Sequence, residues 1–198
     1  MRKAAVRKQV LALRCRLDPL TYLQLSGEIQ QRLLQSDCFL SAKRLALYSP
    51  IRNEVATEQI FMAALRAGKR VFYPRVSGED LVFAAVSHLD QFVTGAFGVA
   101  EPISDHCVGT ADLDLIVVPG VAFSAPGFRL GYGRGYYDRK LESKSSETAS
   151  LGLAFDLQLC DLLPIEEHDQ RLDFIVTETK FISCAKRGVN INSAKRGS

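Results

Sequence analysis

The sequence predicts an α/β fold of three layers, α/β/α, in which helices cover both faces of a mostly parallel sheet. Short apolar runs alternate along the chain with segments of helical spacing, and the turns between them are short. One run, residues 115–118, is wholly apolar and ends at Pro119-Gly120, as expected of a strand that is buried on both faces. An N-terminal helical hairpin is expected to lead into this alternating region.

The two helices of the hairpin are predicted from the spacing of their apolar residues. The second helix follows Asp18-Pro19, with the proline in its first turn, and its stripe is Tyr22, Leu25, Ile29 and Leu33. The stripe of the first helix is Val6, Val10, Leu13 and Leu17. The other positions of the first helix hold no acid and are strongly basic, with Arg2, Lys3, Arg7, Lys8, Arg14 and Arg16.

The alternating region supplies the predicted sheet and its covering helices. Strands are expected at 45–48, 71–73, 81–86, 115–118, 151–155 and 173–176, and helices at 57–67, 136–141 and 157–163. Two stretches, 94–111 and 119–135, have the composition of loops. The second of these leaves the carboxyl end of the strand at 115–118, which is where ligands bind in open α/β sheets.

Composition and charge limit the class of protein. Hydrophobic residues make up 47% and charged residues 24%, which is typical of a globular chain, and a single domain over residues 1–184 is expected. Residues 185–198 hold four basic and no acidic side chains and are predicted to be a flexible tail. Without that tail the net charge of +3 becomes −1, so no surface for nucleic acid is expected.

The lengths of the apolar runs and the spacing of the cysteines exclude further classes of protein. No run is long enough to cross a membrane, and no early apolar segment has the length of a signal peptide. The five cysteines lie far apart without a CxxC pair, which indicates free thiols in a reducing compartment. A cytoplasmic location is therefore predicted, with a mitochondrial one as the alternative, because the basic start resembles a presequence.

The stretch LGYGRGYYD, residues 130–138, is the predicted working site. Its alternate glycines let the backbone turn sharply and bring N–H groups close to an anion. Arg134 and the upstream Arg129 offer donors to phosphate oxygens, and Asp138 is a hard oxygen ligand for Mg²⁺. The alternative is a turn in which the glycines only permit positive φ. The arginines, tyrosines and acid around them favour a nucleotide phosphate.

Three other places could contribute to the site. Lys3 and Arg7 are four apart and could reach one anionic ligand together, or they could form a solvated helix face. Glu54 follows a predicted strand and could bind polar groups of a substrate or cap the helix that begins near Thr57. Asp169, in an acidic cluster with a histidine, could join Asp138 at a metal ion.

The same segments, in this order, closely resemble the 5-formyltetrahydrofolate cyclo-ligase family, also called 5,10-methenyltetrahydrofolate synthetases. The resemblance runs from about residue 2 to about residue 182. Its most specific element is LGYGRGYYDR, and individually weaker ones are Lys3-xxx-Arg7, the segment 48–57, Gly68-Lys69-Arg70-Val71, the segment 114–123 and the closing segment 164–177.

The resemblance implies a three-layer fold and an ATP- and Mg²⁺-dependent enzyme. Such an enzyme closes 5-formyltetrahydrofolate to 5,10-methenyltetrahydrofolate by transfer of the γ-phosphoryl group to the formyl oxygen and attack by N10. It implies catalytic roles for Arg134, Tyr136 and Asp138, and metal ligation by Asp138 and Asp169. ATP would be bound by Lys3, Arg7, Arg129, Leu130, Gly131, Tyr132, Gly133, Arg134, Gly135, Tyr136 and Tyr137, and folate by Glu54, Tyr132, Gly133, Arg134, Gly135 and Tyr136.

The chain departs from the family pattern at Ser124, where the family usually has an aspartate, and its Tyr132 stands at a variable position. The expected partner is a small folate, which could carry a polyglutamate tail, and the chain is expected to be a monomer without nucleic-acid or membrane partners. Two rival functions stay open. One is a phosphate-binding relative, such as a sugar-phosphate isomerase or a folate-binding regulator, and the other is a nucleic-acid binder that uses the basic helix and tail.

Overall fold

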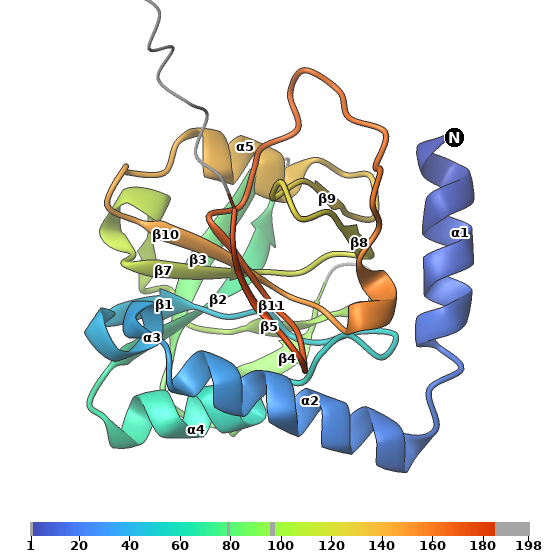
Figure 1. Ribbon diagram of the computed structural model, residues 1–198. Helices are drawn as coiled ribbons and strands as arrows, with labels where there is room; N and C mark the ends of the chain where they lie inside the picture. The colour runs from blue at the N-terminus through green and yellow to red at the C-terminus, as the bar shows by residue number, and fades with distance from the viewer. Residues whose placement is uncertain (1, 79, 96–97, 185–198) are drawn as a thin grey trace, which may run out of the picture.

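A computed structural model describes residues 2–78, 80–95 and 98–184, and it has an eight-stranded sheet at its centre (Figure 1). Five neighbouring strands are parallel, β12 and β3 pair antiparallel with the outer two of them, and β6 pairs antiparallel with β3. The order is β12 (Phe181–Ser183), β11 (Phe174–Val176), β10 (Ala149–Leu153), β7 (Leu115–Val118), β1 (Arg44–Ala46), β2 (Arg70–Ser77), β3 (Asp80–Val86) and β6 (Cys107–Val108).

Helices lie on both faces of this sheet, which confirms the three-layer prediction (Figure 1). One face is covered by α2 (Pro19–Leu34), α3 (Asp37–Ser41) and α4 (Glu58–Arg66), and the other by α5 (Tyr136–Glu142). Two small hairpins complete the fold, β4 (Phe92–Thr94) with β5 (Ala100–Pro102) and β8 (Ala122–Phe123) with β9 (Arg129–Leu130). No helix of the described chain has the length and apolar character needed to cross a membrane.

The strand β7 shows why the fold has two cores. All four of its residues are fully buried, and they alternate between the two faces of the sheet. Leu115 and Val117 pack in the core under α2 and α4, whereas Ile116 and Val118 pack in the core under α5. The continuous apolar run read from the sequence is therefore a strand covered on both sides.

The first helix, α1 (Lys3–Arg14), packs away from the second and stands beside β8 and the 3₁₀ turn η4 (Asp156–Gln158) (Figure 1). The two helices of the predicted hairpin therefore pack on different parts of the molecule: α2 packs on the sheet, and α1 packs on β8 and η4. The predicted apolar stripe of α1 is wrong at Leu13, which is 44% exposed, while Arg14 is fully buried. The cause is that the end of α1 faces backbone carbonyl groups, which a guanidinium can satisfy and a leucine cannot.

Most other predicted elements are confirmed within one to four residues at their ends, but the helix expected at 157–163 is wrong. Only η4 is helical there, and the chain then runs beside β8, with the Cys160 N–H donating to the Phe123 carbonyl at 2.8 Å. The stretch 94–111, expected as a loop, contains β5 and β6. The predicted tail, 185–198, lies outside the described residues.

Close packing of Phe123 holds the β8–β9 hairpin against the sheet. Its ring fills the space over Gly152 of β10, where a Cβ atom would lie 2.6 Å from the ring and 2.9 Å from Leu172. Neither contact is tolerable, so this strand position requires glycine. This packing fixes the position of the β8–β9 hairpin relative to β10, and with it the start of the predicted phosphate loop that follows β9.

We expect Gly152→Ala to destabilise the protein by about 1–3 kcal/mol, because the added methyl group overpacks the core beneath the hairpin. Gly27→Ala is the control: it lies within α2, its Cβ would meet nothing closer than 3.9 Å, and helix propensity should stabilise it by roughly 0.5–1 kcal/mol. Urea unfolding of both variants measures the two effects. Equal stability of Gly152→Ala and the parent would contradict the packing argument.

Candidate active site

The site lies where the strand order of the sheet reverses. From β1 the chain continues to β2 on one side, and from β7 it continues to β10 on the other, although β1 and β7 are neighbours. The loops that leave their carboxyl ends diverge, and such a point is where α/β sheets bind ligands. A cleft of about 1240 Å³ opens there between residues 48–54 and residues 129–139.

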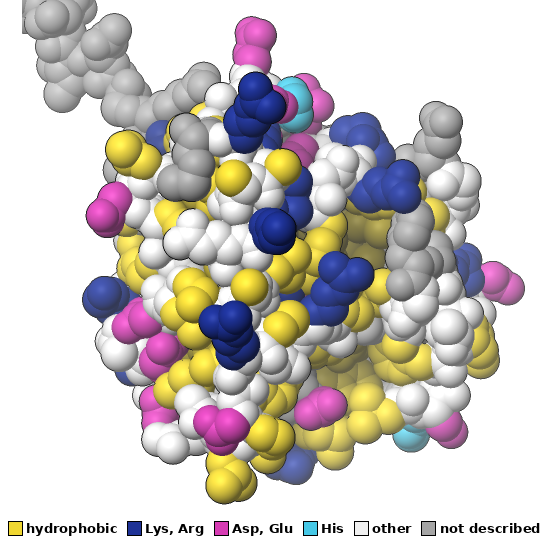
Figure 2. Space-filling model, turned by 90° about the vertical axis from the view of Figure 1, so that its right-hand side faces the viewer, with side chains coloured by type: hydrophobic (Ala, Val, Ile, Leu, Met, Phe, Trp, Pro, Cys, Tyr) yellow, Lys and Arg dark blue, Asp and Glu magenta, His cyan; other side chains and the backbone are white. Residues whose placement is uncertain are grey.

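All the predicted site residues line this cleft: Lys3, Arg7, Glu54, Arg129, Leu130, Gly131, Tyr132, Gly133, Arg134, Gly135, Tyr136, Tyr137, Asp138 and Asp169. Figure 2 shows the face on which it opens, a hollow with hydrophobic side chains inside it and Lys and Arg side chains around it. Four segments far apart in the sequence therefore meet in one place. Their placement is a fact of the fold, and their individual roles stay predictions.

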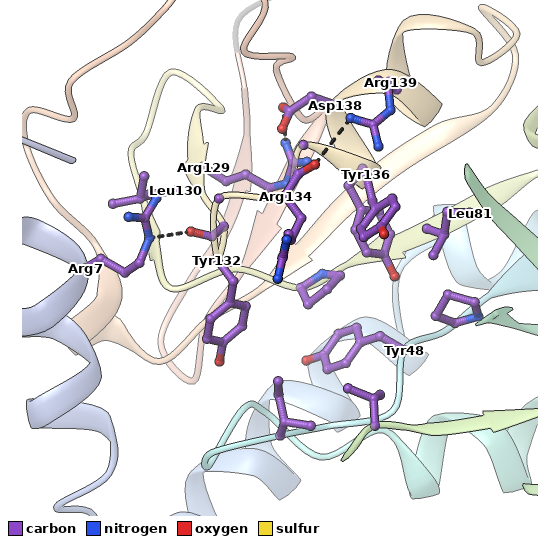
Figure 3. A pocket seen from close by; sticks show the side chains of 18 of the residues that line it. Arg7, Tyr48, Leu81, Arg129, Leu130, Tyr132, Arg134, Tyr136, Asp138 and Arg139 are labelled. Carbon is purple, nitrogen blue, oxygen red and sulfur yellow. Dashed lines mark hydrogen bonds and ion pairs between the residues drawn. The ribbon is translucent and has the colours of Figure 1, made fainter. Parts of the chain in front are cut away.

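The glycine loop adopts the backbone that its composition predicted. Gly133 and Gly135 have φ of 97° and 67°, in the left-handed region that favours glycine, and α5 begins directly after Gly135. Arg7 of α1 donates from Nε to the Gly131 carbonyl at 2.8 Å, which ties the first helix to this loop. Arg134 extends into the cleft between Tyr132 and Tyr136 (Figure 3).

Ion pairs gather at one end of the cleft. The Lys3 ammonium lies 2.7 Å from Asp169 and 3.2 Å from Glu166, and Arg129 donates to Asp138 at 3.0 Å. Burial works against the charge of Lys3, yet these carboxylates hold the pKa of Lys3 above its ordinary value. For Asp169 burial is also outweighed, because the Lys3 hydrogen bond keeps the pKa of Asp169 low.

The same end offers hard oxygen donors for a divalent cation. Ligand atoms of Glu166, His168 and Asp169 all lie within 4.8 Å of one another. Asp138 is close by, since its Oδ1 accepts a hydrogen bond of 3.2 Å from the N–H of Gln170, the residue after Asp169. Carboxylate oxygens suit Mg²⁺, so the donor set fits the predicted ion.

Glu54 occupies the opposite, more enclosed part of the cleft. It follows two residues in the left-handed region, Arg52 and Asn53, and is 3% exposed. Its Oε2 accepts from the Ile51 N–H at 3.0 Å, and the N-cap position of α4 is Thr57, so Glu54 is not the helix cap that the sequence left open. Its buried Oε1 has no hydrogen-bond partner within the described chain.

Burial raises the pKa of Glu54 to about 7, against the opposing effects of the Ile51 N–H, the Arg14 charge and the Tyr132 hydroxyl. A second orphaned group lines the same cleft, because the buried Tyr137 hydroxyl has no partner among the described residues. Buried polar atoms are normally hydrogen-bonded, so these two atoms of one cleft lining, each without a partner among the described residues, indicate a place for a polar ligand.

Two groups of residues, at the cleft or next to it, were not predicted from the sequence. The apolar wall opposite the glycine loop comes from β2 and β3, through Pro74, Val76 and Leu81. The other is Arg14, which the sequence pattern assigned to the polar face of its helix. Its spacing of four residues from the buried Val10 was the signal that it lies on the buried face. Ser124, which departs from the family pattern, lies outside the cleft lining in the β8–β9 turn, where its N–H donates to the Phe128 carbonyl at 2.9 Å.

Because its pKa is raised in the folded state, Glu54 reduces stability as pH rises from about 4.5 to about 7. We expect Glu54→Gln to remove this loss, so that the variant gains about 1–3 kcal/mol relative to the parent between pH 5 and pH 8. Urea unfolding at the two pH values measures the gain. Glu28→Gln, at an exposed position on α2, is the control, and its stability should change with pH as that of the parent does. The same pH dependence in Glu54→Gln as in the parent would refute the raised pKa of Glu54.

Comparison with known proteins places this geometry in a family. The model of the 5-formyltetrahydrofolate cyclo-ligase family matches residues 1–178. The chain is 33% identical to the 5-formyltetrahydrofolate cyclo-ligase of Mycoplasma pneumoniae over 184 residues, which cover 90% of this chain and 99% of the relative. It is 32% identical to the probable 5-formyltetrahydrofolate cyclo-ligase of Caenorhabditis elegans, over 77% of this chain and 81% of the relative.

Solved structures agree with the sequence relatives. The NMR structure of Aquifex aeolicus 5,10-methenyltetrahydrofolate synthetase superposes with a TM-score of 0.84 at 32% identity, covering 98% of this chain and 100% of that one. The synthetase from Mycoplasma pneumoniae superposes with a TM-score of 0.74 at 28% identity, covering 90% and 99%. The chain belongs to the 5-formyltetrahydrofolate cyclo-ligase family.

Proposed function

We propose that this protein catalyses the ATP-dependent cyclisation of 5-formyltetrahydrofolate to 5,10-methenyltetrahydrofolate, with release of ADP and phosphate. The observation that carries the proposal is a single cleft with two chemically different ends. A glycine loop with basic side chains forms one end, and an apolar wall forms the other, together with Glu54, whose Oε1 has no hydrogen-bond partner among the described residues. A reaction that joins a phosphate donor to a flat heterocycle needs both ends in one place.

The glycine-loop end suits the triphosphate. Backbone N–H groups of residues 131–135 and the side chains of Lys3, Arg7 and Arg134 would neutralise the phosphate oxygens. Arg134 would sit at the transferred group, since its side chain reaches furthest into the middle of the cleft among the labelled basic residues (Figure 3). Phosphoryl transfer asks for charge stabilisation and alignment more than for covalent chemistry by the protein.

The Glu54 end suits the reduced pterin. The ring edge of a pterin carries N–H donors, which the unpaired Oε1 of Glu54 would accept, while Pro74, Val76 and Leu81 would pack against its face. The formyl oxygen would then attack the γ-phosphorus and ADP would leave. N10 would attack the activated carbon, phosphate would depart with the C–O bond electrons, and N10 would lose its proton.

Asp138 and Asp169 would hold Mg²⁺, with Glu166 within reach. When bound, the ion would supply positive charge to the phosphate oxygens beyond what the arginines provide. In the structure Lys3 and Arg129 neutralise these two carboxylates. Lys3 would therefore exchange a carboxylate for a phosphate oxygen as nucleotide and metal enter together.

The rival functions have weaker support. A nucleic-acid binder would present the basic side chains of α1 outward, but Lys3 and Arg7 are engaged with the cleft residues Asp169 and Gly131, and Arg14 is fully buried. A relative that binds phosphate without transferring it would have no use for a buried carboxylate oxygen that lacks a partner among the described residues and lines the same cleft.

We propose a cytoplasmic monomer. Because α1 contributes Lys3 and Arg7 to the cleft, its removal as a presequence would take two phosphate ligands away. Relatives do occupy more than one compartment, since one from Arabidopsis thaliana is described as mitochondrial and is 26% identical over 93% of this chain and 76% of the relative.

We expect Arg134→Ala to lower the turnover of 5-formyltetrahydrofolate by about 100-fold or more, because it removes charge at the transferred phosphoryl group. Methenyl-folate absorbance and ADP release measure the loss, and circular dichroism checks the fold. Arg66→Ala, an exposed arginine on α4, should match the parent. Full activity of Arg134→Ala would show that the assignment of this residue is wrong.

Metal removal gives a separate test. We expect chelation of divalent cations to abolish ADP release, and Asp169→Asn to raise the Mg²⁺ concentration for half-maximal activity by about tenfold or more, because one hard ligand is lost. Glu147→Gln, an exposed acid far along the chain from this cluster, serves as the control. A metal-independent rate would rule out the ion site.

A further inference from the structure

Arg14 is a fully buried guanidinium that the cleft lining does not include. Its Nε donates to the Arg52 carbonyl at 3.0 Å and its Nη1 to the Gly120 carbonyl at 3.0 Å. Its Nη2 donates to the Tyr132 hydroxyl at 2.7 Å and, at 3.5 Å, to the Ile51 carbonyl. One side chain thus connects α1 to three segments that the sequence separates widely.

These three segments are the ones that form the two ends of the cleft. Ile51 and Arg52 begin the turn that presents Glu54, and Gly120 lies just beyond the end of β7, next to Pro119 of the cleft lining. Tyr132 belongs to the glycine loop, and the Arg52 guanidinium lies 5.7 Å from the centre of its ring. The planar fork of an arginine can hold several acceptors at fixed mutual angles, which a lysine cannot do.

The charge of Arg14 gives a second reason to assign it a role. Among the described residues it forms no ion pair, and its donors go only to carbonyl oxygens and one hydroxyl. Burying a charge without an ion-pair partner is costly, and a neutral hydrogen-bond donor could satisfy carbonyl groups at this position without that cost. The Glu54 carboxylate is the nearby acid whose charged form Arg14 favours.

We propose that Arg14 is a positioning residue for the cyclisation: it holds the Glu54 turn and Tyr132 in the mutual arrangement that binds the folate, without touching either substrate. The inference rests on the proposed function for the identity of the substrate. A merely structural role for Arg14 would be the docking of α1.

The test compares Arg14→Met, which keeps the length of the stem without its donors, with Arg14→Lys, which keeps the charge without the fork. The KM for 5-formyltetrahydrofolate should rise about 10- to 100-fold in Arg14→Met and by less in Arg14→Lys, while the KM for ATP changes by no more than about twofold. Lys8→Met, exposed on the same helix and outside the cleft lining, is the matched control.

A double variant isolates the contact with Tyr132. Tyr132→Phe alone should raise the folate KM, but added to Arg14→Met it should raise it by no more than about twofold, because residues that act through one contact are not additive. Thermal unfolding and circular dichroism of each variant report the fold. Undocking of α1 would instead lower the melting temperature and raise the KM for ATP as well, because α1 supplies Lys3 and Arg7 to the cleft.

Three results would overturn the proposal. One is an unchanged folate KM in a folded Arg14→Met, and another is an equal rise of both KM values. The third is loss of the folded state in both Arg14 variants, which would make Arg14 a residue of the fold alone. Absence of turnover in the parent and in Lys8→Met would instead reject the proposed function.

Discussion

The pairing of β1 with β7 is the constraint on which the rest of the molecule depends. These two strands are neighbours in space, with Leu45 opposite Leu115, which lies 70 residues later in the sequence. The chain leaves them toward opposite sides of the sheet, from β1 to β2 and from β7 to β10. Their carboxyl ends release the Glu54 turn and the glycine loop at the same edge of the sheet. A cleft follows from this topology before any catalytic side chain is considered.

Buried charged side chains distinguish this cleft and its immediate surroundings from the rest of the core. Arg14 is fully buried and Glu54 nearly so, and the Arg129 side chain is 3% exposed. Each is expensive to remove from water, and the surrounding carbonyls, hydroxyls and carboxylates offset only part of that cost. The apolar cores on both faces of the sheet supply the stability that makes such groups tolerable.

The first helix is as much a part of the site as the glycine loop. It contacts β8 and η4 along one apolar line, Val6 and Val10, and uses three cations at spacings of four and seven to reach the ion-pair end, the loop and the Glu54 turn. A helix that lay against α2 as a closed hairpin could not do this. Its placement across the strand ends joins both substrates' regions through one rigid element.

By itself the sequence determined the layers, the parallel strands and the turn at the glycine loop. Local rules suffice for these, since an apolar run such as 115–118 has few alternatives and glycines such as Gly133 and Gly135 signal a backbone that other residues rarely adopt. The order of the motifs along the sequence also indicated the family. Only the tertiary structure decided that Arg14 is buried, that 157–163 is not a helix, and that one oxygen of Glu54 has no partner among the described residues. Each of these depends on a partner from a distant segment, such as the Gly120 carbonyl for Arg14 and the β8 backbone for Cys160, and no local pattern records such partners.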